Sequence, residues 1–207
     1  PVLLIGGLGM GFTLRAALGE VGPEARLVVA ELVPAVIDWA RGPMAEIFGD
    51  SLDDPRVTLQ EGDVARLIGA GRAAYDAILL DVDNGPDGLV RPDNNRLYGK
   101  AGLHNARRAL SPGGILAVWS ADKDPKFARR LEEVGMAQGH GFAGEFRHAT
   151  LQQHLEAGGL LAAGGPVAQC LHDAVLGHLL PRTEQSGGLA AIFRQRELEG
   201  LDHLPEI

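Results

Sequence analysis

The chain has 207 residues, 45% of them hydrophobic, and a formal net charge of −8 at neutral pH. This length and composition suit one globular domain, or one domain with an appendage. The acidic balance and the lack of a Lys/Arg-rich run argue against sequence-independent nucleic-acid binding, because such binding needs a basic surface. No apolar run approaches the roughly 20 residues of a membrane span.

The cysteine content indicates a reducing compartment. Cys170 is the single cysteine, so no disulfide can form within the chain. The sequence shows no positively charged stretch followed by an apolar one, the pattern of a secretory signal. We therefore expect a cytoplasmic protein with no membrane partner.

The first 31 residues have the pattern of a nucleotide-binding β-α-β unit. The sequence predicts a buried strand over Val2–Ile5, a glycine-rich turn over Gly6–Gly11 and a helix over Phe12–Leu18. A second strand, Arg26–Ala30, ends at Glu31, where a carboxylate can accept hydrogen bonds from ribose hydroxyls. Glycines let a ligand approach the backbone, and the helix N-terminus offers unpaired N–H groups. The alternative is a tight strand-to-helix turn that binds no ligand.

Strands and helices alternate through the middle of the chain. The expected elements are a helix from Pro34 to Phe48, a turn at Asp53–Pro55, a strand at Arg56–Gln60, a helix at Val64–Gly69, a strand at Tyr75–Asp81, a helix at Asn95–Leu110 that Ser111–Gly114 break, a strand at Ile115–Ser120 and a helix at Pro125–Val134. This alternation predicts an α/β fold with a doubly wound, mainly parallel sheet and helices on both faces.

The character of the sequence changes after Met136. We expect residues 1–136 to form a nucleoside-binding α/β domain and residues 137–207 a helical C-terminal extension of unknown role. Helical patterns occur at Glu145–Glu156, Val167–Leu180 and Leu189–Leu198, with a weak strand pattern near Gly141–Phe146. Six of the seven histidines lie in this last third, but His172 and His178 are six residues apart and do not share a helix face. We therefore expect no metal site.

Acidic residues follow several of the predicted strands. Glu31, Asp63 and Asp81 lie at strand ends, as does the turn at Gly6–Gly11. In open parallel sheets, ligands bind beyond the carboxyl ends of the strands, so this convergence predicts a binding site there. Each acid also has a simpler explanation, because Asp63 could only cap the following helix and Asp81 and Asp83 could be ordinary loop acids.

Several motifs together carry a family resemblance. They are VLLIGGLGMG, VVAEL, DPRVTLQEGDV, YDAILLDVDNGP, LY at 97–98 and LSPGGILAVWS. Through them the region from Val2 to Gly135 resembles the spermidine synthase-like (polyamine aminopropyltransferase) branch of the S-adenosylmethionine-dependent methyltransferase superfamily. The resemblance covers about two thirds of the chain.

The resemblance implies roles for the matched nucleoside-site residues. Glu31 would accept hydrogen bonds from both ribose hydroxyls. Asp63 would accept one from the adenine amino group, and Val64 would supply a neighbouring backbone N–H. Gly7 and Gly9 would let the sulfonium-bearing chain lie against the backbone. The implied co-substrate is S-adenosylmethionine or its decarboxylated form, with no metal.

The resemblance also implies the catalytic residues. Asp81 matches the acid that positions and deprotonates the attacking amine, which is necessary because an ammonium has no lone pair. The second acid of the family's D-x-x-D-P pattern is Asn84 here, and Asp83 is a displaced substitute. The family's first turn reads GGGDGG, whereas this chain has Gly9 in place of the acid. The closing strands of the family's sheet are not recognisable in the sequence.

The expected function is therefore aminopropyl transfer to a small amine. Methyl transfer from S-adenosylmethionine on the same scaffold is the alternative, and a non-catalytic nucleoside-binding scaffold protein is a third. A nicotinamide dehydrogenase is a weaker rival, because the turn lacks the G-x-G-x-x-G spacing of dinucleotide binders. The sequence does not determine the acceptor, and it leaves open whether the protein is a homodimer.

Overall fold

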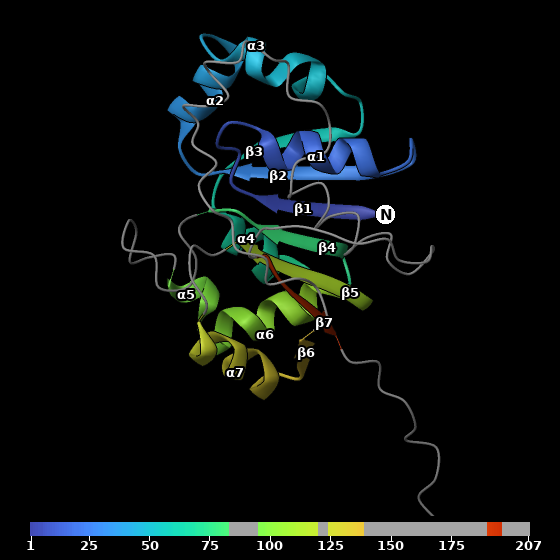
Figure 1. Cartoon of the computed structure of the whole chain (residues 1–207), viewed down its shortest axis with the longest axis vertical. Coiled ribbons are helices and arrows are strands. Elements are labelled where there is room, and N and C mark those ends of the chain that lie inside the picture. Colours follow the sequence, from blue (N-terminus) through green and yellow to red (C-terminus); the bar gives the residue numbers. More distant parts are fainter. Residues whose placement is uncertain (83–94, 120–123, 139–189, 196–207) are drawn as a thin grey trace, which may run out of the picture.

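The computed structural model describes residues 1–82, 95–119, 124–138 and 190–195. Within these residues one seven-stranded sheet is covered by helices (Figure 1). The elements are β1 (Val2–Gly6), α1 (Phe12–Glu20), β2 (Arg26–Glu31), α2 (Pro34–Arg41), α3 (Ala45–Phe48), the 3₁₀ helix η1 (Gly49–Leu52), β3 (Val57–Glu61), α4 (Val64–Ala70), β4 (Tyr75–Leu80), α5 (Asn95–Tyr98), α6 (Lys100–Ala109), β5 (Leu110–Trp119), α7 (Pro125–Glu133), β6 (Met136–Gln138) and β7 (Ala190–Gln195).

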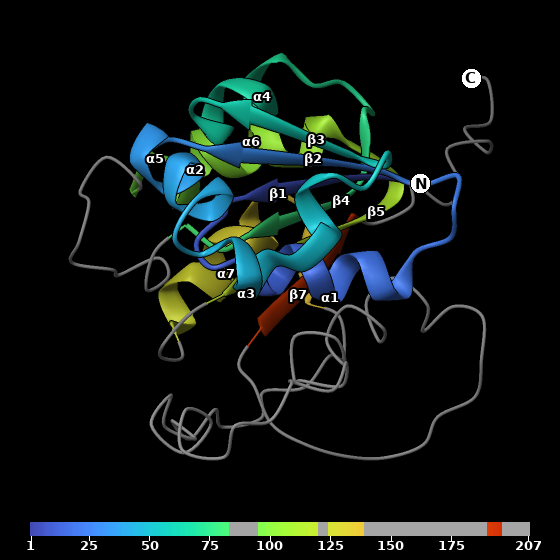
Figure 2. The same cartoon turned by 90° about the horizontal axis from the view of Figure 1, so that it is seen from above.

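The sheet is doubly wound and mainly parallel. Its strand order is β3-β2-β1-β4-β5-β7-β6. Strands β1 to β5 run parallel to one another, and β7 is antiparallel to both β5 and β6. Figure 2 shows α1 and α3 on one side of the sheet and α4 and α6 on the other. The predicted fold class is therefore confirmed, with helices on both faces.

Alternate residues of the central strands fill two separate cores. Leu4 of β1 and Ile78 of β4 are fully buried against α4, α6 and α7. Their neighbours Leu3 and Leu79 pack on the opposite face, against α1 and the segment from α2 to Phe48. Strands covered on both faces need apolar residues at every position, which explains the continuous apolar runs in the sequence. Each large side chain buried in this way contributes about 1.5–3 kcal/mol.

The helix expected at Leu189–Leu198 is wrong, because Ala190–Gln195 forms strand β7. This strand pairs with β5 and β6 and joins the sheet of the N-terminal region. Alanine favours helices, so the local sequence conceals a strand whose partners lie far away along the chain. The other patterns expected between 139 and 189 lie outside the described residues. The domain division at residue 136 stays a prediction.

Two further expectations change at glycine-proline pairs. The helix expected from Pro34 to Phe48 is divided into α2 and α3, because Gly42 has φ −116° and ψ −109° and Pro43 lacks the N–H that would continue the helix. The break expected at Ser111–Gly114 does follow the end of α6 at Ala109, but these residues form a bulge within β5 and do not precede it. Tyr75 pairs with Leu110 and Ala77 with Ile115, so these four residues protrude opposite a single residue of β4.

A buried aromatic pair holds α5 against the rest of the fold. Leu97 and Tyr98 of α5 are 5% and 1% exposed. The Tyr98 ring stands edge-on to Phe127 of α7, with 5.7 Å between the ring centroids. This anchoring holds in place the backbone of Arg96, the residue before Leu97 in α5.

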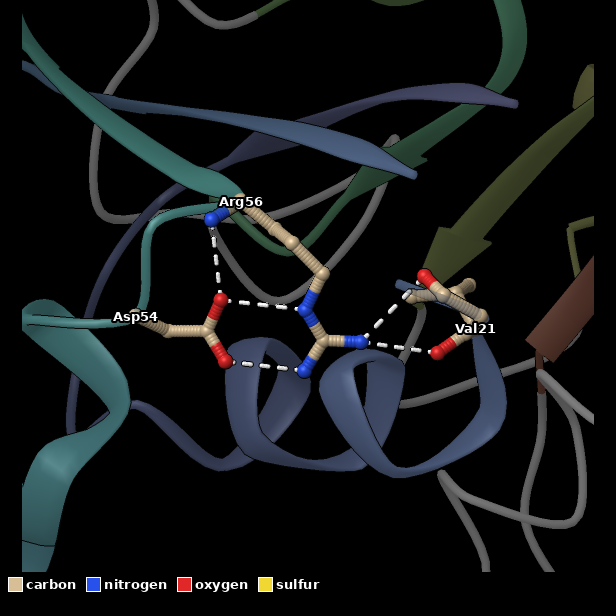
Figure 3. Close-up of polar contacts among 4 residues, drawn as sticks. Val21, Asp54 and Arg56 are labelled. Atoms are coloured by element: carbon tan, nitrogen blue, oxygen red, sulfur yellow. Dashed lines mark hydrogen bonds and ion pairs between the residues drawn. The ribbon is translucent and has the colours of Figure 1, made fainter. Parts of the chain in front are cut away.

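An ion pair at the amino end of β3 ties three segments together (Figure 3). Arg56 donates from Nε and Nη2 to the two carboxylate oxygens of Asp54, at 3.0 and 2.8 Å. Its Nη1 donates to the Val21 carbonyl at 2.8 Å, beyond the end of α1. The turn expected at Asp53–Pro55 thus carries a two-pronged guanidinium–carboxylate contact.

This ion pair makes stability depend on acidity. Hydrogen bonds from the Arg56 side chain lower the pKa of the Asp54 carboxyl from 3.8 to about 2. An acid with a lowered folded-state pKa stabilises the fold above its unfolded pKa, and this contribution disappears as the pH falls through the folded value. We expect Asp54→Asn to flatten the fall of the thermal unfolding midpoint between about pH 4 and pH 2. Thermal unfolding across this range tests the prediction. The control is Asp53→Asn, at an exposed neighbouring residue. The prediction would be contradicted if the unfolding midpoint fell equally steeply with pH in the wild type and in Asp54→Asn.

Candidate functional site

The candidate site lies at the carboxyl ends of β1, β2, β3 and β4. The chain leaves β1 toward β2 and β3 on one side and returns at β4 on the other, so β1 and β4 flank the topological switch point. A crevice at such a point is where open α/β sheets bind ligands. The glycine turn follows β1, Glu31 ends β2, Asp63 follows β3 and Asp81 follows β4.

Gly7 is required for packing within the chain. It has φ +92°, and its N–H donates to the Ala30 carbonyl at 2.8 Å. A Cβ at this position would overlap the carbonyl oxygen of Asp81. Packing against the end of β4 is thus a reason for this glycine within the fold itself, and the expected close approach of a ligand stays a prediction.

Gly9 differs from Gly7 in its surroundings. It has φ +50°, and an added Cβ would meet no atom of the described residues within 4 Å. Gly11 resembles Gly7, because a Cβ there would overlap the Phe48 ring. Gly9 is thus the glycine of the turn beside which the described structure leaves open space. That space fits a ligand lying against the backbone.

Glu31 is buried and holds the glycine turn in place. The residue is only 7% exposed. Oε2 accepts a hydrogen bond from the Leu8 N–H at 2.9 Å, and Oε1 accepts one from the Val33 N–H at 2.8 Å. A carboxylate offers about four acceptor positions, so two remain for the hydroxyls of a ribose. The carboxylate therefore fits a nucleoside and also has a structural role that the sequence did not predict.

We expect Glu31→Gln to lower the free energy of unfolding by about 2 kcal/mol. The amide group of glutamine would face one of two backbone N–H donors, and that donor would lose its partner in a buried place. Urea denaturation measures the change. Glu61→Gln is the control, because Glu61 pairs with Glu31 in the sheet register and is exposed. Equal stability losses in the two variants would contradict the structural role of Glu31.

Asp63 is confirmed as the cap of α4. Its Oδ1 accepts a hydrogen bond from the Ala65 N–H at 2.8 Å, and Oδ2 forms an ion pair with Arg96 of α5. The next residue, Val64, begins α4, so its N–H has no carbonyl partner within the helix. The cap does not exclude a role in ligand binding, because each carboxylate oxygen can accept a second hydrogen bond.

Asp81 is exposed and joined to the first turn of α1. Its Oδ2 accepts a hydrogen bond from the Thr13 hydroxyl at 2.7 Å, and its backbone N–H donates to the Gly6 carbonyl at 2.9 Å. Asp83, the second expected catalytic acid, lies outside the described residues. The sequence analysis did not identify Thr13, although a hydroxyl residue two positions after the last glycine of the turn would have been the signal.

The structure thus connects the predicted residues through the glycine turn. The turn contacts Glu31 through Leu8 and contacts the Asp81 backbone through Gly6 and Gly7. Asp63 forms its own contacts with α4 and with Arg96. The sequence analysis did not predict the role of Arg96 either, because its partner Asp63 lies on a different element.

The described residues contain no group of three or more His, Cys, Asp or Glu side chains that could hold a metal ion. Within the same part of the chain, every helix is too short or too polar to traverse a bilayer. His172 and His178 lie outside the described residues. The absence of a metal therefore stays a prediction.

Comparison with curated proteins finds two kinds of transferase. The chain is 39% identical over 120 residues to the polyamine aminopropyltransferase of Mycobacterium tuberculosis, a match that covers 56% of this chain and 22% of the relative. It is 34% identical over 118 residues to putrescine N-methyltransferase 1 of Nicotiana tabacum, covering 56% of this chain and 29% of the relative. The chain thus spans less than a third of the length of these relatives. No protein-family model matches it.

Among solved structures, the chain is similar to a spermidine synthase from Thermotoga maritima. The TM-score is 0.52 at 22% sequence identity, over 64% of this chain and 44% of that chain. At this identity the likeness shows the fold alone. The described region therefore has the fold that its sequence resemblance predicts.

Proposed function

We propose that this chain, spermidine synthase-like in sequence and in fold, binds S-adenosylmethionine or its decarboxylated form and transfers an aminopropyl group to an amine. The observation that carries the proposal is the glycine turn, which joins Glu31 at the end of β2 to Asp81 at the end of β4. The turn follows β1, and β1 and β4 flank the switch point of the sheet. Similarity to a polyamine aminopropyltransferase supports the same reaction.

The nucleoside half of the proposed site uses the buried and capped groups. Glu31 would accept the ribose hydroxyls with the two acceptor positions that Leu8 and Val33 leave. Asp63 would accept the adenine amino group beside its bond to Arg96, and the Val64 N–H would donate to the ring. The donor's sulfonium-bearing chain would lie in the open space beside Gly9.

The catalytic half of the proposed site is centred on Asp81. The amine nitrogen forms a bond to the carbon beside the sulfonium, the carbon–sulfur bond breaks, and its electron pair neutralises the sulfur. The amine must give up one proton, and an exposed carboxylate at the end of β4 can accept it. The same negative charge attracts the cationic donor and acceptor. Asp83 is proposed as a second acid that binds the amine.

Methyl transfer to an amine is the second candidate. The similarity to putrescine N-methyltransferase favours it, as does Gly9, which stands where the aminopropyltransferase pattern has an acid. Both reactions displace a thioether from carbon, and they differ in the group that moves. They therefore leave different nucleoside products.

Product analysis distinguishes the candidates. The protein is incubated with putrescine and either donor, and the nucleosides are separated by chromatography. Methylthioadenosine from decarboxylated S-adenosylmethionine supports aminopropyl transfer, and S-adenosylhomocysteine from S-adenosylmethionine supports methyl transfer. Calorimetry with methylthioadenosine tests binding separately. Binding without either product would favour a scaffold protein, and affinity for a nicotinamide dinucleotide alone would overturn the proposal.

We propose a small amine as the acceptor, a cytoplasmic location, and no nucleic-acid or membrane partner. The names of the relatives support a small amine. The single cysteine and the acidic charge support the location and the absence of nucleic acid. A homodimer is proposed as the working state, and sedimentation of the purified protein would test it.

A further inference from the structure

One side-chain contact crosses the switch point of the sheet. The Thr13 hydroxyl, on the second residue of α1, donates to Oδ2 of Asp81 at 2.7 Å. The two residues are 68 positions apart in the chain, so the bond joins elements that only the fold brings together. Hydrogen bonds to a charged acceptor are stronger than those between neutral groups.

The backbone of Asp81 is fixed independently of this bond. Its N–H donates to the Gly6 carbonyl at 2.9 Å, and its own carbonyl occupies the space that a Cβ on Gly7 would need. With the backbone held on both sides, rotation of the side chain is the remaining freedom. The Thr13 hydroxyl removes that freedom by holding one of the two carboxylate oxygens.

We propose that Thr13 is a positioning residue for the reaction, which orients the Asp81 carboxylate so that Oδ1 faces the attacking amine. Among the described residues, Oδ1 accepts no hydrogen bond, while Oδ2 is occupied by Thr13. The two oxygens of the Asp81 carboxylate thereby have different roles: Oδ2 is held by Thr13, and Oδ1 accepts the proton. This inference rests on the proposed function, because it assigns Thr13 a role through Asp81.

A purely structural role for Thr13 would have a different signature. A bond that only links α1 to β4 would change stability and nucleoside binding, and it would not change the rate of the chemical step selectively. A positioning role changes kcat, because misplacing a reacting group is costly even when the ligand still binds. The distinction therefore needs kcat, KM and binding to be measured separately.

The test compares three variants of the whole chain. Thr13→Val removes the hydroxyl and keeps the branched shape, whereas Thr13→Ser keeps the hydroxyl. Thr58→Val is the matched control, because Thr58 is exposed on the edge strand β3. Turnover of decarboxylated S-adenosylmethionine with putrescine gives kcat and KM. Calorimetry with methylthioadenosine gives nucleoside affinity.

We expect Thr13→Val to lower kcat about tenfold, with Thr13→Ser and Thr58→Val close to wild type. Nucleoside affinity should stay within about twofold in all three. An unchanged kcat in Thr13→Val would overturn the inference, as would a parallel loss of kcat and nucleoside affinity. If Thr13→Val does not fold, Thr13→Ala replaces it with the same criteria. A wild-type chain that turns over no donor would overturn the proposed function, and this inference with it.

Discussion

Asp81→Asn is expected to lower kcat for aminopropyl transfer about 100-fold or more, because the amide cannot accept the proton that the amine must lose. Asparagine has nearly the same shape as aspartate and can still accept the Thr13 hydrogen bond through its side-chain oxygen. The fold and the nucleoside site should therefore survive the change. Steady-state turnover with putrescine gives kcat, and calorimetry with methylthioadenosine gives the affinity.

The matched control for this substitution is Asp53→Asn. It removes the same charge from the turn before β3, at the opposite end of the sheet from the proposed site. Its kcat should equal that of the wild type. A wild-type rate of aminopropyl transfer in Asp81→Asn would show that Asp81 is not the base and would leave proximity and orientation as the source of catalysis. Loss of nucleoside binding in Asp81→Asn would instead indicate a ligand-binding role.

Gly7→Ala is expected to lower the free energy of unfolding by about 3 kcal/mol or more. The residue has φ +92°, which side chains rarely adopt, and its new Cβ would overlap the Asp81 carbonyl oxygen. That oxygen belongs to the backbone, so it cannot move aside as a flexible side chain would. The end of β4 would be displaced together with the proposed base. Urea denaturation measures the loss.

Gly9→Ala provides the comparison within the same turn. It has φ +50°, and none of the described residues lies close to the missing Cβ, so we expect a loss of about 1 kcal/mol from backbone strain. If the donor lies against Gly9, this variant should lose affinity for methylthioadenosine while it remains folded. Equal stability losses at Gly7 and Gly9 would contradict the packing role of Gly7. Unchanged nucleoside affinity in Gly9→Ala would move the ligand away from this part of the turn.

The sequence predicted the parts of the fold that local patterns determine. Apolar runs such as the one in β4 identified the parallel strands, and the alternation with helices identified the fold class. The gathering of acids at one edge of the sheet could also be predicted, because the carboxyl ends of parallel strands lie at the same edge. The bulge in β5 and the break between α2 and α3 show that glycine and proline mark an irregularity without determining its form.

Contacts between residues far apart in the chain could not be predicted from the sequence. Strand β7 was predicted as a helix, since its alanines favour helices and its pairing with β5 depends on distant residues. The bonds of Glu31 to Leu8 and of Thr13 to Asp81 also join distant elements. A motif indicates which side chains are at a strand end, but their hydrogen-bond partners depend on how neighbouring loops pack.

The two glycines of the turn show the same limit. In the sequence, Gly7 and Gly9 have the same chemistry and both suggested close approach of a ligand. The structure separates them, because one packs against β4 and the other faces open space. A glycine-rich motif therefore combines positions that maintain the fold with positions that leave room beside the backbone, and only the surroundings of each missing Cβ distinguish them.

The position of β7 has a consequence for biosynthesis. The strand inserts between β5 and β6, although it emerges from the ribosome after both. Until it arrives, the nascent sheet presents an open edge at β5, and among the strands that the structure describes β6 has no partner. Unpaired edges of this kind invite pairing with other chains, and pairings between distant residues form slowly. Completion of this sheet is therefore a late event, and the interval before it is when the growing chain is most exposed to misassembly.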